Sequence, residues 1–112
     1  MLEIKRVNNN DIRSLFEIKG GELVYSLLLE NQNIGYGIIR NNSECKIEIY
    51  ILDEYQGNGY GNYLFTELLN KVKDNINLKV DLCNNIMRRI IKKNGGIELG
   101  RNGKYIYYVI KK

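Results

Sequence analysis

The sequence contains no histidine, proline or tryptophan, and its two cysteines are Cys45 and Cys83. Without histidine the chain has no Ser-His-Asp or Cys-His nucleophile, no imidazole base and no histidine-bound zinc. Two cysteines cannot form an all-cysteine zinc site. Because both adjoin apolar runs, we expect buried thiols rather than a disulfide. The sequence therefore predicts no metal site.

Long apolar runs are also missing. No stretch approaches the ~20 apolar residues of a membrane span, and residues 2–7 mix charged and apolar side chains instead of forming a secretory signal. The chain has 112 residues, 44% hydrophobic and 27% charged, as expected for one globular domain over 1–112. We expect a cytoplasmic protein without membrane contacts.

The net charge of +4 suggests an anionic partner: nucleic acid, a membrane surface or a phosphorylated small molecule. The excess is too small to choose among them. Basic residues gather in the stretch 88–93. Such a stretch is either a solvated helix face or a contact with a ribose phosphate or RNA.

Hydrophobic periodicity predicts the element order β-α-β-β-β-α-β-α-β-β. Strands are expected over 2–7, 22–30, 34–40, 46–52, 76–82, 97–99 and 104–110, helices around 12–16, 61–72 and 87–91, and turns at 31–33, 41–42 and 100–103. A right-handed crossover makes the strands of the unit 46–82 parallel, whereas the other neighbours form antiparallel hairpins. The fold class is therefore α+β, with a mixed, mostly antiparallel central sheet and helices on both faces.

Glycines alternate in the segment 57–61, between a predicted strand and a predicted helix. Glycine allows a ligand to approach the main chain closely. The first N–H groups of a helix have no partner within it, and with the helix dipole they attract anions. A tight turn without a ligand is the alternative, but three glycines before an amphipathic helix favour a phosphate site.

Two other phosphate motifs fit this loop less well. Asp81 lies near the end of the next strand, where a dinucleotide fold places its ribose-binding acid. However, Asn62 stands where G-x-G-x-x-G requires glycine, and residues 53–56 separate the strand from the glycines. A Walker A loop is excluded because no G-K-[ST] follows.

The segment Gln56–Gly61 matches [QR]-x-x-G-x-[GA], and the chain thereby resembles the GNAT superfamily of N-acetyltransferases, whose acyl-CoA pyrophosphate signature this is. Residues 49–55 resemble the family's preceding strand and short turn. Asn84, Lys93 and Gly95 resemble its next motif, N-x-x-a-x-x-l-Y-x-K-x-G-F. The resemblance covers 44–97, and the element order extends it to the whole chain. It implies a GNAT-like fold with acetyl-CoA as cofactor.

The resemblance also implies roles for particular residues. Gln56, the first residue of the signature, would belong to the cofactor site. The pyrophosphate would be held by the main-chain N–H groups of Gly57, Asn58, Gly59, Tyr60 and Gly61. The main chain of Ile51 and Leu52 would pair with the pantetheine arm like an added strand, and the N–H of Ile51 would polarise the thioester carbonyl. The Asn84 side chain would face the cofactor; capping its own helix is an equal alternative.

Three features depart from the family pattern. Ile91 stands where the family often has a tyrosine acid, so Tyr107 or Tyr108 would replace it, or solvent would, or the domain is not catalytic. Gly96 replaces the closing aromatic residue of the second motif. Only residues 8–21 separate the first two strands, where the family often places two helices, so we expect an open acceptor side.

Amide formation requires a neutral amine and therefore a proton acceptor. Glu48 is our candidate base, because it lies on the strand that leads to the loop, where burial in a central strand would raise its pKa. Glu44 is the second candidate. The alternative for Glu48 is a solvated carboxylate or an ion-pair partner for a lysine.

These observations predict an acyl-CoA-dependent N-acyltransferase that moves acetyl from acetyl-CoA to a primary amine by direct attack in a ternary complex. The alternatives are a GNAT-like domain that binds the cofactor without turnover and a basic nucleic-acid-binding module, which only the charge supports. The acceptor is expected to be a small-molecule or peptide amine that the sequence does not identify. A homodimer is a further candidate assembly.

Overall fold

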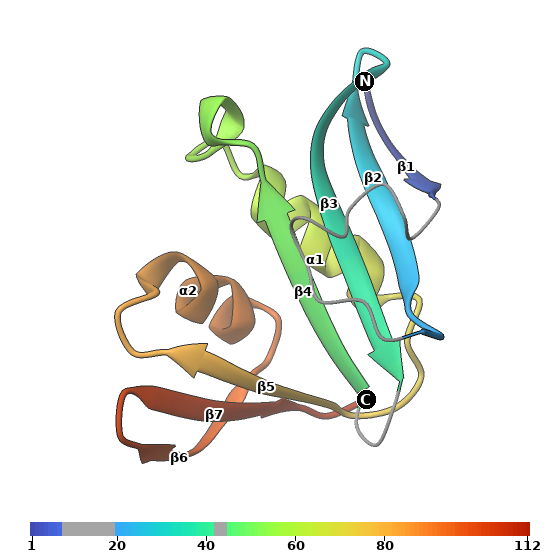
Figure 1. The fold of residues 1–112 in the computed structure, drawn as a ribbon. Coiled ribbons are helices and arrows are strands. Elements are labelled where there is room, and N and C mark those ends of the chain that lie inside the picture. The colour runs from blue at the N-terminus through green and yellow to red at the C-terminus, as the bar shows by residue number, and fades with distance from the viewer. Residues whose placement is uncertain (8–19, 42–44) are drawn as a thin grey trace.

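The computed structural model describes residues 1–7, 20–41 and 45–112 (Figure 1). Within them, one sheet has the strand order β1-β2-β3-β4-β5-β7-β6. Its strands are β1 (Leu2–Arg6), β2 (Leu23–Leu29), β3 (Gln32–Asn41), β4 (Cys45–Ile51), β5 (Ile76–Asp81), β6 (Ile97–Asn102) and β7 (Tyr105–Ile110). A 3₁₀ turn, η2 (Asp53–Tyr55), precedes helix α1 (Tyr60–Leu69), and α2 (Asn85–Lys93) lies between β5 and β6.

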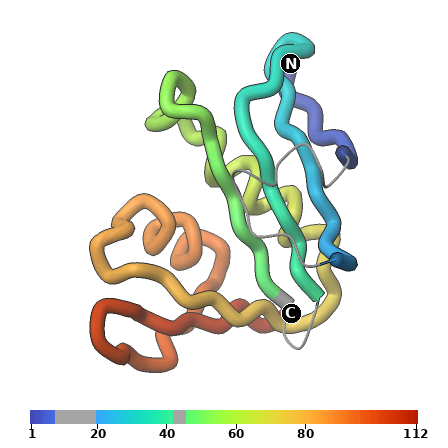
Figure 2. The backbone as a smooth tube through the Cα atoms, in the orientation of Figure 1, coloured from blue at the N-terminus to red at the C-terminus, as the bar shows by residue number. Residues whose placement is uncertain are grey.

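The strands β4 and β5 form the parallel pair that the sequence predicts, while the other pairs of this sheet are antiparallel. In the described part of the chain, β4 and β5 register at one pair, Cys45↔Ile76, and then diverge (Figures 1 and 2). By contrast, β3 and β4 stay in register from Asn41↔Cys45 to Gly35↔Ile51. Among the described strands, the carboxyl end of β4 therefore has a partner on one side only.

The main core lies on the sheet face that both described helices cover. Its fully buried side chains include Ile47 of β4, Phe65 of α1, Ile91 of α2 and Tyr108 of β7. A Cβ atom at Gly37 would come within 2.4 Å of Leu68 Cδ1, so α1 packs directly on β3 there and a side chain would force Leu68 to shift. A smaller cluster on the opposite face contains Val24 and Ile38. The helix expected around 12–16 lies outside the described residues.

Two turn predictions were wrong by a few residues. The hairpin predicted to turn at 31–33 turns at Glu30 and Asn31, which have φ of 49° and 67°. Positive φ at both central residues matches the twist of a two-residue hairpin, so β3 begins earlier than predicted. The last hairpin turns at Gly103 and Lys104, because a bulge near Gly100 lets β6 continue through the predicted turn. Residues 42–44, which follow Asn41, lie outside the described residues.

The prediction that both cysteines are buried was wrong for Cys83, which is exposed. Strand β5 ends at Asp81, and Cys83 occupies the turn that follows, where its N–H donates to Asp81 Oδ1 over 2.9 Å. The apolar run before the cysteine ends with the strand. The side chain of Cys45 is not among those described. None of the described helices is long and apolar enough to cross a membrane.

Candidate functional site

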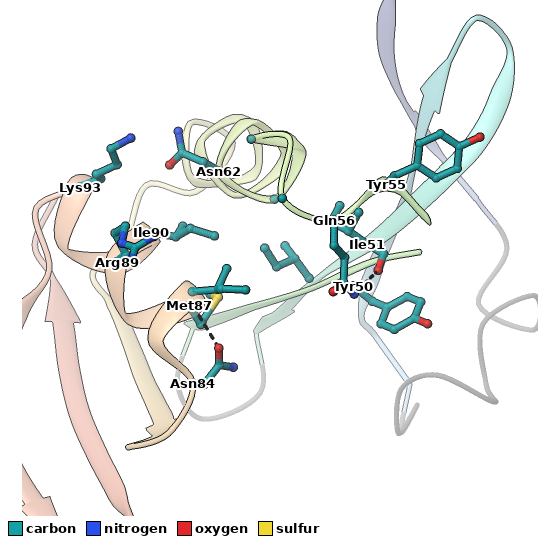
Figure 3. A pocket seen from close by; sticks show the side chains of 15 residues that line it. Tyr50, Ile51, Tyr55, Gln56, Asn62, Asn84, Met87, Arg89, Ile90 and Lys93 are labelled. Atoms are coloured by element: carbon teal, nitrogen blue, oxygen red, sulfur yellow. Dashed lines mark hydrogen bonds between the residues drawn. The ribbon is translucent and has the colours of Figure 1, made fainter. Parts of the chain in front are cut away.

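A pocket of about 430 Å³ lies where β4 has lost its partner β5 (Figure 3). The carboxyl end of β4, the loop after it, the start of α1 and one side of α2 form its walls. Its lining residues are Ile49, Tyr50, Ile51, Tyr55, Gln56, Gly57, Gly59, Gly61, Asn62, Asn84, Ile86, Met87, Arg89, Ile90 and Lys93. The structure thus brings together the two segments that the sequence motifs marked.

The main chain of Ile51 faces the pocket side of β4. Leu52 donates its N–H to the carbonyl of Ile34 on β3 over 2.9 Å. Because main-chain groups alternate sides along a strand, the N–H and C=O of Ile51 point away from β3. Gln56 Nε2 donates to the Ile51 carbonyl over 2.9 Å, and no described strand accepts the N–H. The N–H of Ile51 is thus directed away from β3, whereas the N–H of Leu52 is bonded to β3.

The glycine loop contains a run of main-chain N–H groups that have no partner among the described residues. Gly57 and Gly59 have φ of 81° and 83°, a left-handed conformation that favours glycine. The N–H groups of residues 57–62 donate to no residue that the structure describes. Asn58 does not use them either, because its side-chain amide donates to the carbonyls of Tyr55 and Gln56, both over 3.3 Å.

The loop therefore has the properties expected of an anion cradle. A Cβ atom at Gly57 or Gly59 would meet nothing within 4 Å, so the space beside the main chain is open. Gly59 is the N-cap residue of α1 and has no side chain with which to cap it. An anion in the pocket would supply the missing acceptor and would also interact favourably with the helix dipole.

The amino end of α2 differs, because Asn84 caps it. Asn84 Oδ1 accepts a hydrogen bond from the N–H of Met87 over 3.1 Å, which confirms the capping alternative (Figure 3). Asn84 also lines the pocket. Its Nδ2 has no partner among the described residues, so capping does not prevent this amide from meeting a ligand.

Asn94, which no sequence motif marked, is the C-cap residue of α2. Its Nδ2 donates to Asn62 Oδ1 over 3.3 Å and to the carbonyl of Ile90 over 2.8 Å. Its Oδ1 accepts from the Thr66 hydroxyl over 3.1 Å. These bonds fix the last turn of α2 beside the first turns of α1, and thus set one end of the pocket.

Glu48 does not line the pocket. Its Oε2 accepts from Arg40 Nε, and Arg40 Nη1 donates to Glu22 Oε2 over 3.0 Å. The Glu48 side chain is 44% exposed, so the expectation of a strand covered on both faces was wrong at this position. Its ion-pair partner is an arginine rather than a lysine. Glu22, buried beneath this pair, was also missed, and Glu44 lies outside the described residues.

The tyrosines of β7 lie on both faces of the sheet. Tyr107 shares one face with Tyr105, registers with Lys79 and does not line the pocket. Tyr108 is buried on the other face, where its hydroxyl oxygen accepts from Arg88 Nε over 3.3 Å. Ile91, at the position of the family's tyrosine, is fully buried in the core.

Comparison with known families identifies the class of protein. The model of the acetyltransferase (GNAT) family matches residues 5–95. This chain belongs to that family, whose cofactor is acetyl-CoA. Comparison with curated protein sequences gives no match.

Similar solved structures have the same fold. The N-acetyltransferase PseH of Campylobacter jejuni in complex with acetyl coenzyme A has a TM-score of 0.77 at 15% identity, covering 100% of this chain and 99% of that one. A Bacillus anthracis structure, also in complex with acetyl coenzyme A, has a TM-score of 0.77 at 18% identity, with coverages of 100% and 99%. Mutant forms of the spermidine/spermine N-acetyltransferase SpeG of Vibrio cholerae have a TM-score of 0.77 at 16% identity, with coverages of 99% and 95%.

Proposed function

We propose that this protein transfers an acetyl group from acetyl-CoA to a primary amine by direct attack within a ternary complex. The observation that carries the proposal is the unpartnered main-chain N–H run of residues 57–62, placed at the uncapped end of α1 and opening onto the pocket. Family membership supports the same activity. We infer that the acceptor is a small-molecule or peptide amine.

The residues of the pocket fit such a cofactor. The N–H run of the loop would hold the pyrophosphate, and the apolar wall formed by Ile49, Met87 and Ile90 would cover the pantetheine arm. The N–H of Ile51 would donate to the thioester carbonyl, a contact that stabilises the negative charge developing there. The bound cofactor supplies an acetyl group activated as a thioester.

Proton transfer is assigned to residues outside this pocket. Glu48 remains the proposed base: its Oε2 is engaged by Arg40, which leaves Oε1, on a 44% exposed side chain, to accept a proton from the amine. Tyr107 remains the proposed acid, with solvent as the alternative, because Ile91 offers no hydroxyl at the usual position.

A cofactor-binding domain without turnover is the second candidate function. One observation favours it: the family's tyrosine position is occupied by an aliphatic side chain with no solvent exposure. The two candidates share the cofactor site and differ in whether product forms.

A thermal-denaturation experiment tests both candidates together. Acetyl-CoA at one hundred times its Kd should raise the free energy of unfolding by ~2.7 kcal/mol, a rise in Tm on the order of ten degrees. NAD and a short RNA should have much smaller effects. A Tm that no acyl-CoA changes would overturn both candidates.

A thiol-release assay over a panel of amines then separates them. The proposed transferase should release free coenzyme A faster with at least one amine than in buffer alone, and mass spectrometry should find the acetylated amine. A protein whose Tm rises with acetyl-CoA but which acetylates no amine, small or peptidic, would be the cofactor-binding domain.

A further inference from the structure

One row of α2 residues faces the pocket. Ile86, Arg89 and Lys93 lie on successive turns of the helix and line the pocket. With a rise of about 1.5 Å per residue, Arg89 and Lys93 are separated by roughly 6 Å along the axis. Lys93 lies at the same end of the pocket as Asn62, and Asn84 lies at the other end (Figure 3). The pocket thus has a basic end beside the start of α1.

The neighbouring basic residues of α2 are engaged elsewhere. Arg88 donates to the Tyr108 hydroxyl over 3.3 Å and to the carbonyl of Leu82 over 3.0 Å. Glu98 of β6 has a lowered pKa, chiefly because of its hydrogen bond from Arg101 and further because of the charges of Lys92 and Arg88. Neither residue lines the pocket. The basic stretch therefore divides into a structural row and a pocket row.

The pocket row, Arg89 and Lys93, has no negative partner within residues 1–7, 20–41 and 45–112. Neither Arg89 nor Lys93 forms an ion pair or hydrogen bond with a residue in the described ranges. Two like charges four residues apart on a helix repel each other. The bonds of Asn94 nevertheless fix this turn against α1. An anion bound between the two side chains would relieve the repulsion. Both side chains line the pocket, so the pocket could hold such an anion.

We propose that Arg89 and Lys93 bind the 3′-phosphate on the ribose of coenzyme A. The inference rests on the proposed function. The main-chain N–H groups of residues 57–62 suffice for the pyrophosphate, and the ligand's other phosphate then requires donors of its own. Arginine and lysine side chains are the usual donors to such a group. These two residues would make the site select coenzyme A over its 3′-dephospho form.

Binding affinities test this assignment without any measurement of activity. Calorimetry would compare acetyl-CoA with acetyl-3′-dephospho-CoA on the native protein and on Arg89→Gln, Lys93→Gln and Lys92→Gln. The native protein should bind acetyl-CoA more tightly, by about tenfold or more. Arg89→Gln and Lys93→Gln should each weaken acetyl-CoA by roughly five- to tenfold and leave the dephospho ligand within about twofold. Lys92→Gln, the matched control on the same helix, should change neither affinity.

Three results would overturn the assignment. Equal affinity of the native protein for both ligands would show that no residue selects the 3′-phosphate. Equal weakening of both ligands by Arg89→Gln and Lys93→Gln would move these cations to another part of the ligand. An effect of Lys92→Gln as large as theirs would reduce the role to net charge. Failure of the native protein to bind either ligand would instead defeat the proposed function and this inference with it.

Discussion

The two helices that line the pocket begin in opposite ways. Helix α1 begins at Gly59, which has no side chain, after a loop whose N–H groups donate to no described residue. Helix α2 begins at Asn84, whose side chain accepts one of the helix's free N–H groups. A side-chain cap contributes about 1 kcal/mol. Helix α1 lacks this contribution at the point where a phosphate would supply it.

The difference shows how one pocket combines two kinds of recognition. The start of α1 offers main-chain donors, whose positions the fold fixes and which any pyrophosphate satisfies. Helix α2 needs no ligand to cap it, and its later turns contribute side chains, Arg89 and Lys93, that can discriminate. Substitutions in the glycine loop before α1 should therefore have different effects from substitutions in α2. The following changes test that contrast, from the largest expected effect to the smallest.

Gly59→Asp should have the largest effect, because it places a carboxylate at the N–H cradle. Two like charges 4 Å apart at an effective dielectric constant of 20 repel by about 4 kcal/mol, which predicts at least about 100-fold weaker acetyl-CoA binding. Gly59→Asn is the matched control, since it imposes the same left-handed strain without the charge. Calorimetry should find the asparagine variant within about tenfold of the native protein. Similar losses in both variants would point to backbone strain instead.

Glu48→Gln should leave both helix ends intact and lower turnover. Loss of a general base typically costs about 100-fold or more in kcat, while the Kd for acetyl-CoA should stay unchanged because Glu48 does not line the pocket. The glutamine oxygen can still accept from Arg40. Glu3→Gln on the edge strand β1 is the control for removing an exposed carboxylate. Unchanged kcat in Glu48→Gln would remove this residue from the mechanism.

Asn84→Ala should destabilise α2 in the protein that has no cofactor bound. Loss of the cap should lower the free energy of unfolding by about 1 kcal/mol and Tm by about 4–8 °C. Asn84→Asp retains an oxygen that can cap the helix, so its Tm should stay near the native value. Denaturation scans without cofactor would measure both variants. An unchanged Tm in the alanine variant would mean that α2 does not depend on its cap.

Gly61→Ala should have the smallest effect. A Cβ atom there would lie 3.4 Å from Ile90 Cδ1 and 3.5 Å from Ile49 Cδ1, close to ordinary contact distances. The change in the free energy of unfolding should be below about 1 kcal/mol, because alanine also favours the helix. Acetyl-CoA affinity should remain within about twofold. A loss of acetyl-CoA affinity as large as that of Gly59→Asp would mean that Gly61 is as important for cofactor binding as Gly59.

Much of the fold follows from patterns that act locally. Alternation of apolar and polar residues along Lys46–Ile51 predicts a strand, because its period matches the pleat. The glycines of residues 57–61 predict a loop there, because few other residues adopt positive φ. The parallel pairing of β4 and β5 follows from the handedness of crossovers. Each of these depends on neighbouring residues or on a rule with few exceptions.

The remaining features depend on long-range packing. Nothing near Glu48 in the sequence indicates that Arg40 and Glu22 lie beside it, since Glu48 is on β4, Arg40 is on β3 and Glu22 directly precedes β2. The role of Asn94 requires knowing that α1 and α2 lie side by side. The division of the basic stretch into a pocket row and a structural row depends on which side of α2 faces the core.

Amide chemical shifts of ¹⁵N-labelled protein titrated with acetyl-CoA test the central claim most directly. The main-chain amides of residues 57–62 should show the largest changes, because each gains an acceptor that no described residue supplies. The amides of the edge strands β1 and β6 should move little. Saturable binding of acetyl-CoA that leaves the chemical shifts of the residue 57–62 amides unchanged would contradict the account.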